Sequence, residues 1–409
     1  MKAKALVLFM LCATLLPSTQ GDAGELVDFS KATIVAPSDS PGLRTRSVEV
    51  LSEEIEKRTG LELSPSSRWP DGAGPIIVVG TREELPALHA SLAFLSEASA
   101  PGAEGFTLVV RGESPPLAVV AGEDARGVLY GVGRLLRKAV WSPGRLLIPS
   151  DLEITTAPRY PIRGHQLGNR DVNNTYEAWT AEHYDSYIRD LALFGANSIE
   201  IIPPFIGDFL TDRPQRVVPS DEMMPYIIEA IDSYGMDVWA WYANQAEGID
   251  EHIDPGDEAF TNPAYVEERL EERDRRFGQM NRLDHLVIPG GDPGNMSPEV
   301  LFAWLEKLVP VLRQHHPDAK VWIADQFDAA HPAWYELFFE EINKKPAWLG
   351  GPISGPWGKT TFASMRRRVD QENPNRRSPY SPHTNARQNT RHREDRAHAL
   401  TNPQNHPNT

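Results

Sequence analysis

Short apolar runs alternate with longer amphipathic stretches between residues 158 and 355. The runs predict strands at Ile162–Leu167, Ser198–Ile202, Asp237–Trp241, Leu286–Ile288 and Val321–Ala324, with Trp348–Ile353 as a candidate sixth strand. The stretches between them predict helices near Ala181–Phe194, Asp221–Tyr234, Pro263–Phe277, Pro298–His315 and Pro332–Lys344. Regular alternation of this kind predicts an α/β fold with a parallel sheet. A TIM (β/α)8 barrel is the favoured closed form, because another folded unit precedes it.

That preceding unit, residues 24–157, shows a different order of elements. Strands are expected at Ala32–Ala36, Ile76–Gly80, Gly105–Arg111 and Leu117–Gly122, and helices at Ser47–Arg58 and Asp124–Lys138. The order is βαβ followed by ββα. It predicts a small N-terminal α+β domain with an open sheet and helices on one face.

The barrel pattern stops before eight strands are reached. A barrel needs eight strands and about 250 residues, and residues 158–358 offer five or six units. From Lys359 the composition shifts to Arg, Asn, His and Pro, although Arg366–Asp370 could finish one helix. The expectation is an incomplete barrel followed by an irregular or disordered basic tail at 359–409. A truncated or frame-shifted reading frame would account for that tail, and a solvated basic tail is the alternative.

The first 23 residues have the pattern of a secretory signal peptide. Lys2 and Lys4 precede an apolar run from Ala5 to Pro17 that is too short to span a bilayer. A secreted or periplasmic protein is therefore expected, with no membrane segment after cleavage. The only cysteine, Cys12, lies in this run, so the mature chain would lack disulfides, a catalytic thiolate and cysteine-ligated metals.

The formal net charge of the 409-residue chain is −16, which argues against nucleic-acid binding. No phosphate-binding glycine loop, nucleophile elbow or zinc motif occurs, so no cofactor and no metal are expected. The acidic stretch Asp250–Glu258 carries oxygen ligands but does not match an EF-hand, and a solvated loop is its default interpretation. The sequence leaves the oligomeric state open.

Candidate catalytic carboxylates follow two of the expected strands. Asp292 comes after the strand at His285–Ile288 and two glycines, at the end of a barrel strand where catalytic residues lie. Its alternative role is to cap the following turn, although Ser297 and Pro298 already suit a helix start. Asp325 follows the fifth strand and is the candidate acid/base partner, with solvation in a loop as its alternative.

Sugar-binding candidates lie on the first and third strands. Trp241 and Tyr242 end the third strand, and aromatic faces stack on the apolar faces of sugar rings. Arg163 and His165 share one face of the first strand by alternation. The alternatives are core packing for the aromatic residues, a structural ion pair for Arg163 and a satisfied interior position for His165. Glu200, within an apolar strand, is interpreted as part of an internal pair.

Three segments together resemble family 20 glycoside hydrolases and their relatives, including the family 67 α-glucuronidases. They are Gly127-Val-Leu-Tyr-Gly-Val-Gly133, Asp151-Leu-Glu-Ile154 and Ala157-Pro-Arg-Tyr-Pro-Ile-Arg-Gly164, at the junction between the two expected domains. The resemblance covers roughly residues 30–350. It implies a small α/β domain in front of a (β/α)8 catalytic barrel, and a carbohydrate substrate.

The resemblance also implies roles for single residues. Arg163 matches an arginine that binds sugar hydroxyls, and Asp292 matches an aspartate that orients the substrate's acetamido group. Pro293 stands where the family has its general acid, a glutamate, and Ile288 stands where it has a histidine. We therefore expect a secreted glycosidase of α-glucuronidase-like or hexosaminidase-like type, the former fitting better the loss of the Asp-Glu pair. The alternative is a non-catalytic carbohydrate-binding protein on a degenerate barrel.

Overall fold

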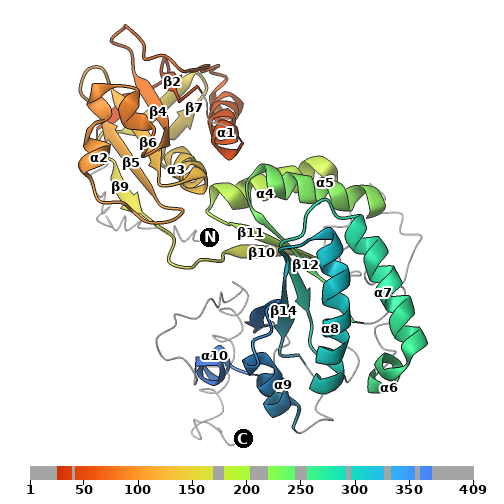
Figure 1. Cartoon of the computed structure of the whole chain (residues 1–409). Helices are drawn as coiled ribbons and strands as arrows, with labels where there is room; N and C mark the ends of the chain where they lie inside the picture. Colours follow the sequence, from red (N-terminus) through yellow and green to blue (C-terminus); the bar gives the residue numbers. More distant parts are fainter. Residues whose placement is uncertain are drawn as a thin grey trace, which may run out of the picture.

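The computed structural model describes residues 25–38, 42–168, 179–202, 220–244, 256–291, 296–326, 333–354 and 360–370. The chain forms a small N-terminal domain and a larger domain built on parallel strands (Figure 1). The segment between Thr156 and Gly164 joins the two sheets. The predicted signal peptide, residues 1–23, lies outside the described residues.

The small domain contains a mixed six-stranded sheet in the order β3-β2-β4-β6-β5-β9. Its strands are β2 (Thr33–Val35), β3 (Pro65–Ser66), β4 (Ile76–Thr81), β5 (Phe106–Arg111), β6 (Leu117–Gly122) and β9 (Glu153–Thr156). The long helices α1 (Leu43–Thr59) and α3 (Ala125–Lys138) cover one face, as predicted. Alternation along β4 sends Ile77 and Val79 to that face, and Ile76 and Val78 to the other.

Several short elements of this domain have no periodic signal in the sequence. The turns η1 (Leu85–Ala87) and η2 (Ala90–Leu92) and the helix α2 (Phe94–Glu97) cover the second face of the sheet. A separate antiparallel sheet is formed by β1 (Leu26–Asp28), β8 (Arg145–Pro149) and β7 (Val140–Ser142). Strands of three to five residues are too short for alternation to predict them.

Within its described residues, the second domain contains six parallel strands whose order in the sheet is their order in the chain. They are β10 (Gly164–Gly168), β11 (Ser198–Ile202), β12 (Asp237–Trp241), β13 (His285–Ile288), β14 (Lys320–Ala324) and β15 (Leu349–Ile353). The helices are α4 (Ala181–Leu193), α5 (Ser220–Ser233), α6 (Gly256–Thr261), α7 (Pro263–Gly278), α8 (Pro298–His315), α9 (Trp334–Asn343) and α10 (Phe362–Asp370). The predicted α/β class, the alternation and the sixth strand are confirmed.

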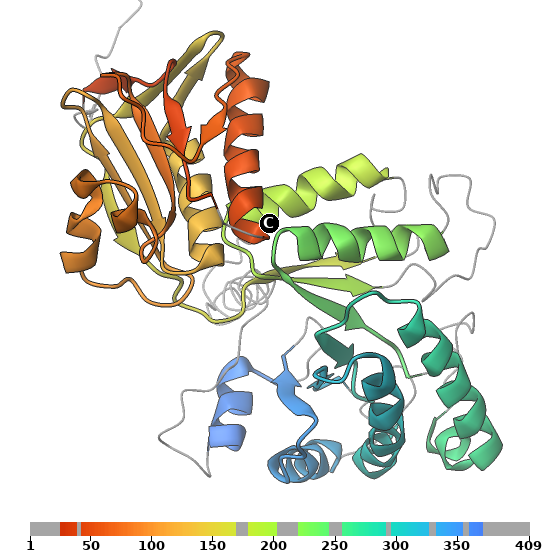
Figure 2. The same cartoon turned by 45° about the horizontal axis from the view of Figure 1, so that its top comes forward.

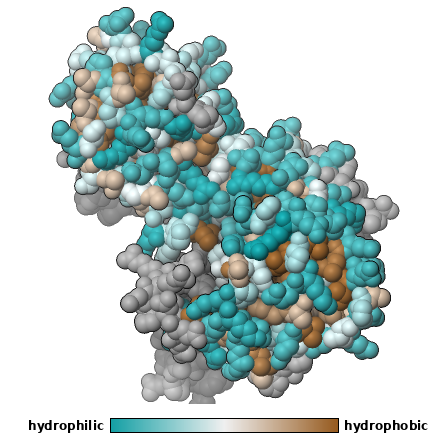
Figure 3. Space-filling model, in the orientation of Figure 1, coloured by the Kyte–Doolittle hydropathy of each residue, from teal (hydrophilic) through white to brown (hydrophobic). Residues whose placement is uncertain are grey.

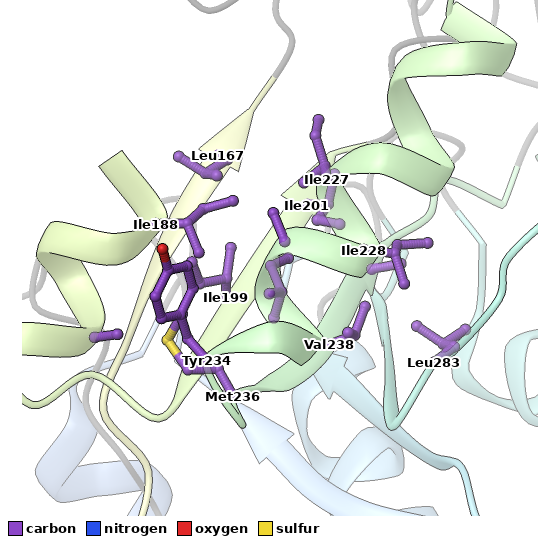
Figure 4. Packing of buried hydrophobic residues seen from close by; sticks show 14 of the residues in the cluster. Leu167, Ile188, Ile199, Ile201, Ile227, Ile228, Tyr234, Met236, Val238 and Leu283 are labelled. Atoms are coloured by element: carbon purple, nitrogen blue, oxygen red, sulfur yellow. The ribbon is translucent and has the colours of Figure 1, made fainter. Parts of the chain in front are cut away.

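The outer face of this sheet is an aliphatic core under the helices. Leu167, Ile199, Ile201 and Val238 point toward α4 and α5, where Ile188, Ile227 and Ile228 meet them (Figure 4). Because side chains alternate along a strand, the residues between these four lie on the opposite, inner face. Parity along each strand therefore decides which residues can form a site inside the barrel.

The helix α10 occupies the start of the stretch predicted as an irregular tail. Its Met365 is 1% exposed, and the guanidinium of Arg368 lies 4.5 Å from the ring centre of Tyr335 on α9. The sequence analysis expected that Arg366–Asp370 could finish one helix within this stretch, and α10 ends with these residues. Residues 371–409 lie outside the described residues. No helix in the described part of the chain is both long and apolar enough to cross a membrane.

The two domains meet where α3 packs beside α4 (Figure 2). Gly133 permits the close approach, because a Cβ there would lie 2.1 Å from the carbonyl oxygen of Leu193. Arg126 on α3 then reaches Asp237 at the start of β12, with 2.6 Å between Nη2 and Oδ1. The seam therefore lies against the amino ends of the parallel strands.

Candidate functional site

The inner face of the parallel sheet combines polar and aromatic side chains. Register pairs Gln166 with Glu200, Glu200 with Trp239, and Trp239 with His285 on adjacent strands. Trp239 also packs with Val287, Trp322 and Ile353 in a small cluster of its own. In a barrel this face lines the interior, and the carboxyl ends of its strands form the mouth.

Three rings lie together in the middle of this face. The ring centre of Trp239 is 4.2 Å from that of His285 and 5.1 Å from that of Trp322. The indole N–H of Trp322 donates to Nδ1 of His285 at 3.0 Å, so the neutral imidazole carries its proton on Nε2. Burial lowers the pKa of His285, which favours that neutral form. The indole N–H of Trp239, a residue 4% exposed, finds no acceptor among the described residues.

A bulge in β15 makes room for Trp322. Val321 pairs with Leu349 and Trp322 with Gly351, so Gly350 is the extra residue. A Cβ on Gly350 would lie 2.4 Å from Cε2 of Trp322. The Leu-Gly-Gly sequence therefore lets the large indole lie on the inner face.

Glu200 and Gln166 form a polar pair on the same face. Glu200 is 4% exposed and its Oε1 accepts a hydrogen bond of 2.7 Å from Nε2 of Gln166. This agrees with the interpretation of Glu200 as part of an internal pair. It also places a carboxylate among the described inner-face residues.

Of the two aromatic candidates on β12, only Trp241 lies on the inner face. It is half-buried against the cluster of Trp239, Val287 and Trp322, at the carboxyl end of its strand. Tyr242 is 1% exposed and turns outward, where Phe277 and the guanidinium of Arg273 enclose its ring. The prediction of Tyr242 as a substrate ligand does not fit this position, because parity sends it to the helix layer.

The two candidates on the first strand also lie away from the inner face. His165 contacts Tyr187 of α4, with 3.2 Å between Nε2 and the hydroxyl oxygen. Arg163 donates to the carbonyl oxygens of Gly195 and Tyr160 and pairs with Glu104 of the small domain. Arg163 thus has the structural ion pair that was its alternative interpretation, and it lies at the amino end of the sheet.

The two glycines that precede Asp292 in the sequence lie against the end of β14 and the chain that follows it. Gly290 has φ +76°, and a Cβ there would lie 2.3 Å from the carbonyl oxygen of Ala324. The N–H of Gly291 donates to the carbonyl oxygen of Gln326 at 2.7 Å, and its carbonyl oxygen accepts from the N–H of Met296 at 3.4 Å. Asp292 itself lies outside the described residues.

Asp325 does not face the mouth as expected. It is 0% exposed, and its Oδ2 accepts hydrogen bonds from the backbone N–H and the hydroxyl of Thr360, just before α10. Its Oδ1 has no partner among the described residues, and burial raises the pKa of this carboxyl above its ordinary value. Along β14 its parity is that of the outward residues Val321 and Ile323.

Asn244 is a mouth residue that the sequence analysis did not single out. It is 1% exposed, and its Nδ2 donates to the carbonyl oxygen of Gly290 at 2.8 Å. A second tether joins the same two loops, because Oδ1 of Asp257 accepts from the N–H of Ser297 at 2.7 Å. The segment that follows β12 is thus hydrogen-bonded to residues that come before and after Asp292 in the sequence. One indication of this role for Asn244 was present in the sequence, which is its position three residues after Trp241.

Within the described ranges, no group of three or more His, Cys, Asp or Glu residues is arranged to hold a metal ion. Among the described residues, the inner face offers aromatic surfaces, the imidazole of His285 and the paired carboxylate of Glu200. Such a set suits a hydroxyl-rich ligand with apolar faces.

No profile of a known protein family matches the sequence, and no curated protein matches it. Solved structures match it in fold. A mutant β-hexosaminidase from Streptomyces plicatus, in complex with its product GlcNAc, has a TM-score of 0.55 at 14% identity, over 81% of this chain and 72% of that chain. The chain has a family 20-like fold.

Two further structures agree. The family 20 β-N-acetylhexosaminidase from Streptomyces coelicolor has a TM-score of 0.55 at 14% identity, over 88% of this chain and 81% of that chain. A family 138 enzyme targeting pectin rhamnogalacturonan II has a TM-score of 0.52 at 12% identity, over 79% of this chain and 38% of that chain. The resemblance drawn from the junction segments is confirmed at the level of the fold.

Proposed function

We propose that this chain is a glycoside hydrolase that acts on oligosaccharides or polysaccharides at the carboxyl ends of β10–β15. The observation that carries the proposal is the inner face itself, on which Trp241 extends a cluster of Trp239, His285 and Trp322 toward the mouth. Aromatic faces of this kind suit the apolar faces of sugar rings. The family 20-like fold supports the same class of reaction by analogy.

In this proposal Trp241 is the stacking platform and Asp292 is the carboxylate that acts on the substrate. Hydrolysis of a glycosidic bond normally needs two carboxyl groups. Glu200 is a candidate for the second, since it lies on the inner face and Asp325 does not. Pro293 occupies the position of the family's usual acid, so a glucuronide is preferred to an N-acetylhexosaminide as substrate.

The decisive experiment is a panel of chromogenic glycosides, including glucuronides and N-acetylhexosaminides. We expect Asp292→Ala to lower kcat by at least about a hundredfold, as loss of an acid, base or nucleophile does. Trp241→Ala should raise KM by about tenfold with a smaller change in kcat. Asp318→Ala, an exposed carboxylate before β14, is the matched control and should leave both constants unchanged. Full activity in Asp292→Ala would remove Asp292 from the mechanism.

A second candidate is a non-catalytic carbohydrate-binding protein on the same inner face. The burial of Asp325 and its bonds to Thr360 favour this candidate, because they withdraw one of the two carboxylates proposed for catalysis. Calorimetry distinguishes the two functions. Sugar binding that Trp241→Ala abolishes, without turnover of any glycoside, would establish the binding protein in place of the hydrolase.

Export to the periplasm or the medium is part of the proposal and rests on the sequence of residues 1–23. Fractionation of a host that expresses the whole chain tests it. We expect a shortened product outside the cytoplasm, and a full-length product in the cytoplasm would contradict export.

A further inference from the structure

Unpaired basic side chains gather at the seam between the two domains. Arg134, Arg137 and Lys138 on α3 and Arg159 in the linker form no ion pair with any carboxylate of the described residues. The neighbouring arginines at the same seam behave differently, since Arg126, Arg163, Arg189 and Arg282 all pair with acidic residues. Unpaired cations in a chain of net charge −16 need a separate explanation.

Two exposed aromatic rings lie among these cations. Phe194 is 73% exposed and Tyr160 is 38% exposed. The guanidinium of Arg137 lies 4.5 Å from the ring centre of Phe194, and that of Arg159 lies 5.7 Å from the ring centre of Tyr160. Each pair joins an apolar face to a positive charge at the surface.

Arg163 brings the two pairs together. Its Nε donates to the carbonyl oxygen of Gly195 at 2.8 Å, directly after Phe194, and its Nη1 donates to that of Tyr160 at 2.6 Å. Asn197 adds a third bond, from Nδ2 to the carbonyl oxygen of Pro161 at 2.7 Å. The linker therefore runs beside the end of α4. We call the two pairs on these neighbouring segments, Arg137 with Phe194 and Arg159 with Tyr160, the cationic strip.

The cationic strip is held in place while its charges stay uncompensated. Arg137 donates to the carbonyl oxygen of Leu193, which orients its guanidinium without neutralising it. Burial and the nearby charge of Arg134 lower the pKa of Arg137, which shows that its surroundings disfavour the positive charge. An anion at the strip would relieve that repulsion, and the guanidinium fork suits carboxylate or sulfate oxygens.

We propose that the cationic strip binds an acidic polysaccharide, outside the mouth of the barrel. Aromatic faces would stack on sugar rings while Arg137 and Arg159 pair with charged groups on the rings. The net negative charge of the protein disfavours binding to a densely charged nucleic acid or an anionic membrane. It disfavours binding to an acidic polysaccharide less, because the charges on that ligand are farther apart. On the face drawn in Figure 3, the residues around the waist between the domains are largely hydrophilic.

Affinity electrophoresis of the full chain in gels that contain polygalacturonate, dextran or dextran sulfate tests the proposal. We expect retardation by polygalacturonate, no retardation by dextran, and weakening as salt is raised. Phe194→Ala and Arg159→Gln should each weaken binding by about tenfold. Tyr226→Ala, with the same 38% exposure as Tyr160, and Lys307→Gln on α8 are matched controls that should bind as the wild type does.

Three results would overturn the proposal. Equal retardation by dextran would remove the role of charge. Retardation by dextran sulfate or polygalacturonate that Phe194→Ala leaves unchanged would reduce the strip to a general anion site. Binding to anionic phosphatidylserine vesicles without binding to polygalacturonate would assign it to a membrane. Trp241→Ala should leave this binding intact, so its outcome is independent of the proposed hydrolysis.

Discussion

The two ends of the parallel sheet differ in how their polar groups are satisfied. At the amino ends, Glu104 accepts hydrogen bonds from Arg126, Arg163 and Asn197, and Asp237 pairs with Arg126. At the carboxyl ends, Asn244 and Asp325 each keep a buried oxygen without a partner among the described residues. A buried polar group without a partner costs stability.

This difference suggests that the amino ends of the sheet serve stability and that its carboxyl ends serve function. The amino ends are closed by the small domain, and Glu104, Asp237 and the arginines Arg126 and Arg163 each have a partner of opposite sign there. At the carboxyl ends the amide oxygen of Asn244 has no partner among the described residues, as expected where a ligand is to be bound. Changes at the amino ends should therefore alter unfolding, and changes at the carboxyl ends should alter ligand binding unless they disturb the backbone.

The largest effect is expected from Gly290→Ala, which disturbs the backbone at the carboxyl ends. Its φ is +76° and the new Cβ would lie 2.3 Å from a backbone oxygen, so the turn must shift. We expect a loss of about 3 kcal/mol in the free energy of unfolding, together with loss of activity or sugar binding. Gly144→Ala is the control, because Gly144 has φ +70° with nothing within 4 Å. It should lose only about 1 kcal/mol in the same denaturant titration, and equal losses would contradict the steric argument.

Arg126→Ala tests the amino ends. It removes the guanidinium that joins Glu104 of the small domain to Asp237 of the barrel domain, both of which are largely buried. We expect a loss of about 2 kcal/mol in the free energy of unfolding, below the figure for full burial because the pair keeps some exposure. Arg111→Ala, from an exposed pair with Glu153, should lose no more than about 0.5 kcal/mol. A loss for Arg126→Ala that only equals this control would mean that the seam adds no stability.

The pH dependence of unfolding is a second test of the amino ends of the sheet. Burial would raise the pKa of Glu104, but hydrogen bonds from Arg126, Asn197 and Arg163 outweigh it and hold the pKa below its ordinary 4.5. A lowered pKa in the folded state gives stability that is present above 4.5 and is lost as the pH falls below that value. Glu104→Gln should flatten the fall in stability on acidification, measured by denaturant titrations at several pH values.

The sequence predicts the elements of the barrel domain well and the direction of its side chains poorly. Helices such as α8 (Pro298–His315) agree to the residue, because Ser297 caps the start and the apolar period is long. Alternation correctly puts Arg163, His165 and Leu167 on one face. That face was taken to be the inner one, and it is the outer one, since Leu167 packs under α4 and α5.

Most of the misplaced candidates lie one residue along the strand from a residue that does face inward. Tyr242 turns to the helices and Trp241 to the inside, and Gln166 takes the inner position assigned to His165. The apolar neighbours carried the signal, because a buried leucine in a polar strand marks the side on which the helices lie. The bonds of Arg163 to a glutamate 59 residues away could not be predicted, because they depend on how two domains pack.

The smallest effect is expected from Asp325→Asn, which separates a buried carboxyl from a catalytic one. Burial raises the pKa of Asp325, so its charged form is disfavoured in the folded state, and stability should fall as the pH rises above the ordinary 3.8. Asparagine keeps an oxygen for Thr360 and carries no charge, so the change at neutral pH should stay within about 1 kcal/mol and flatten this fall. Activity or sugar binding should persist, because the carboxylate turns toward α10. An inactive Asp325→Asn variant with unchanged stability would return Asp325 to the chemistry and erase the distinction drawn between it and Glu200.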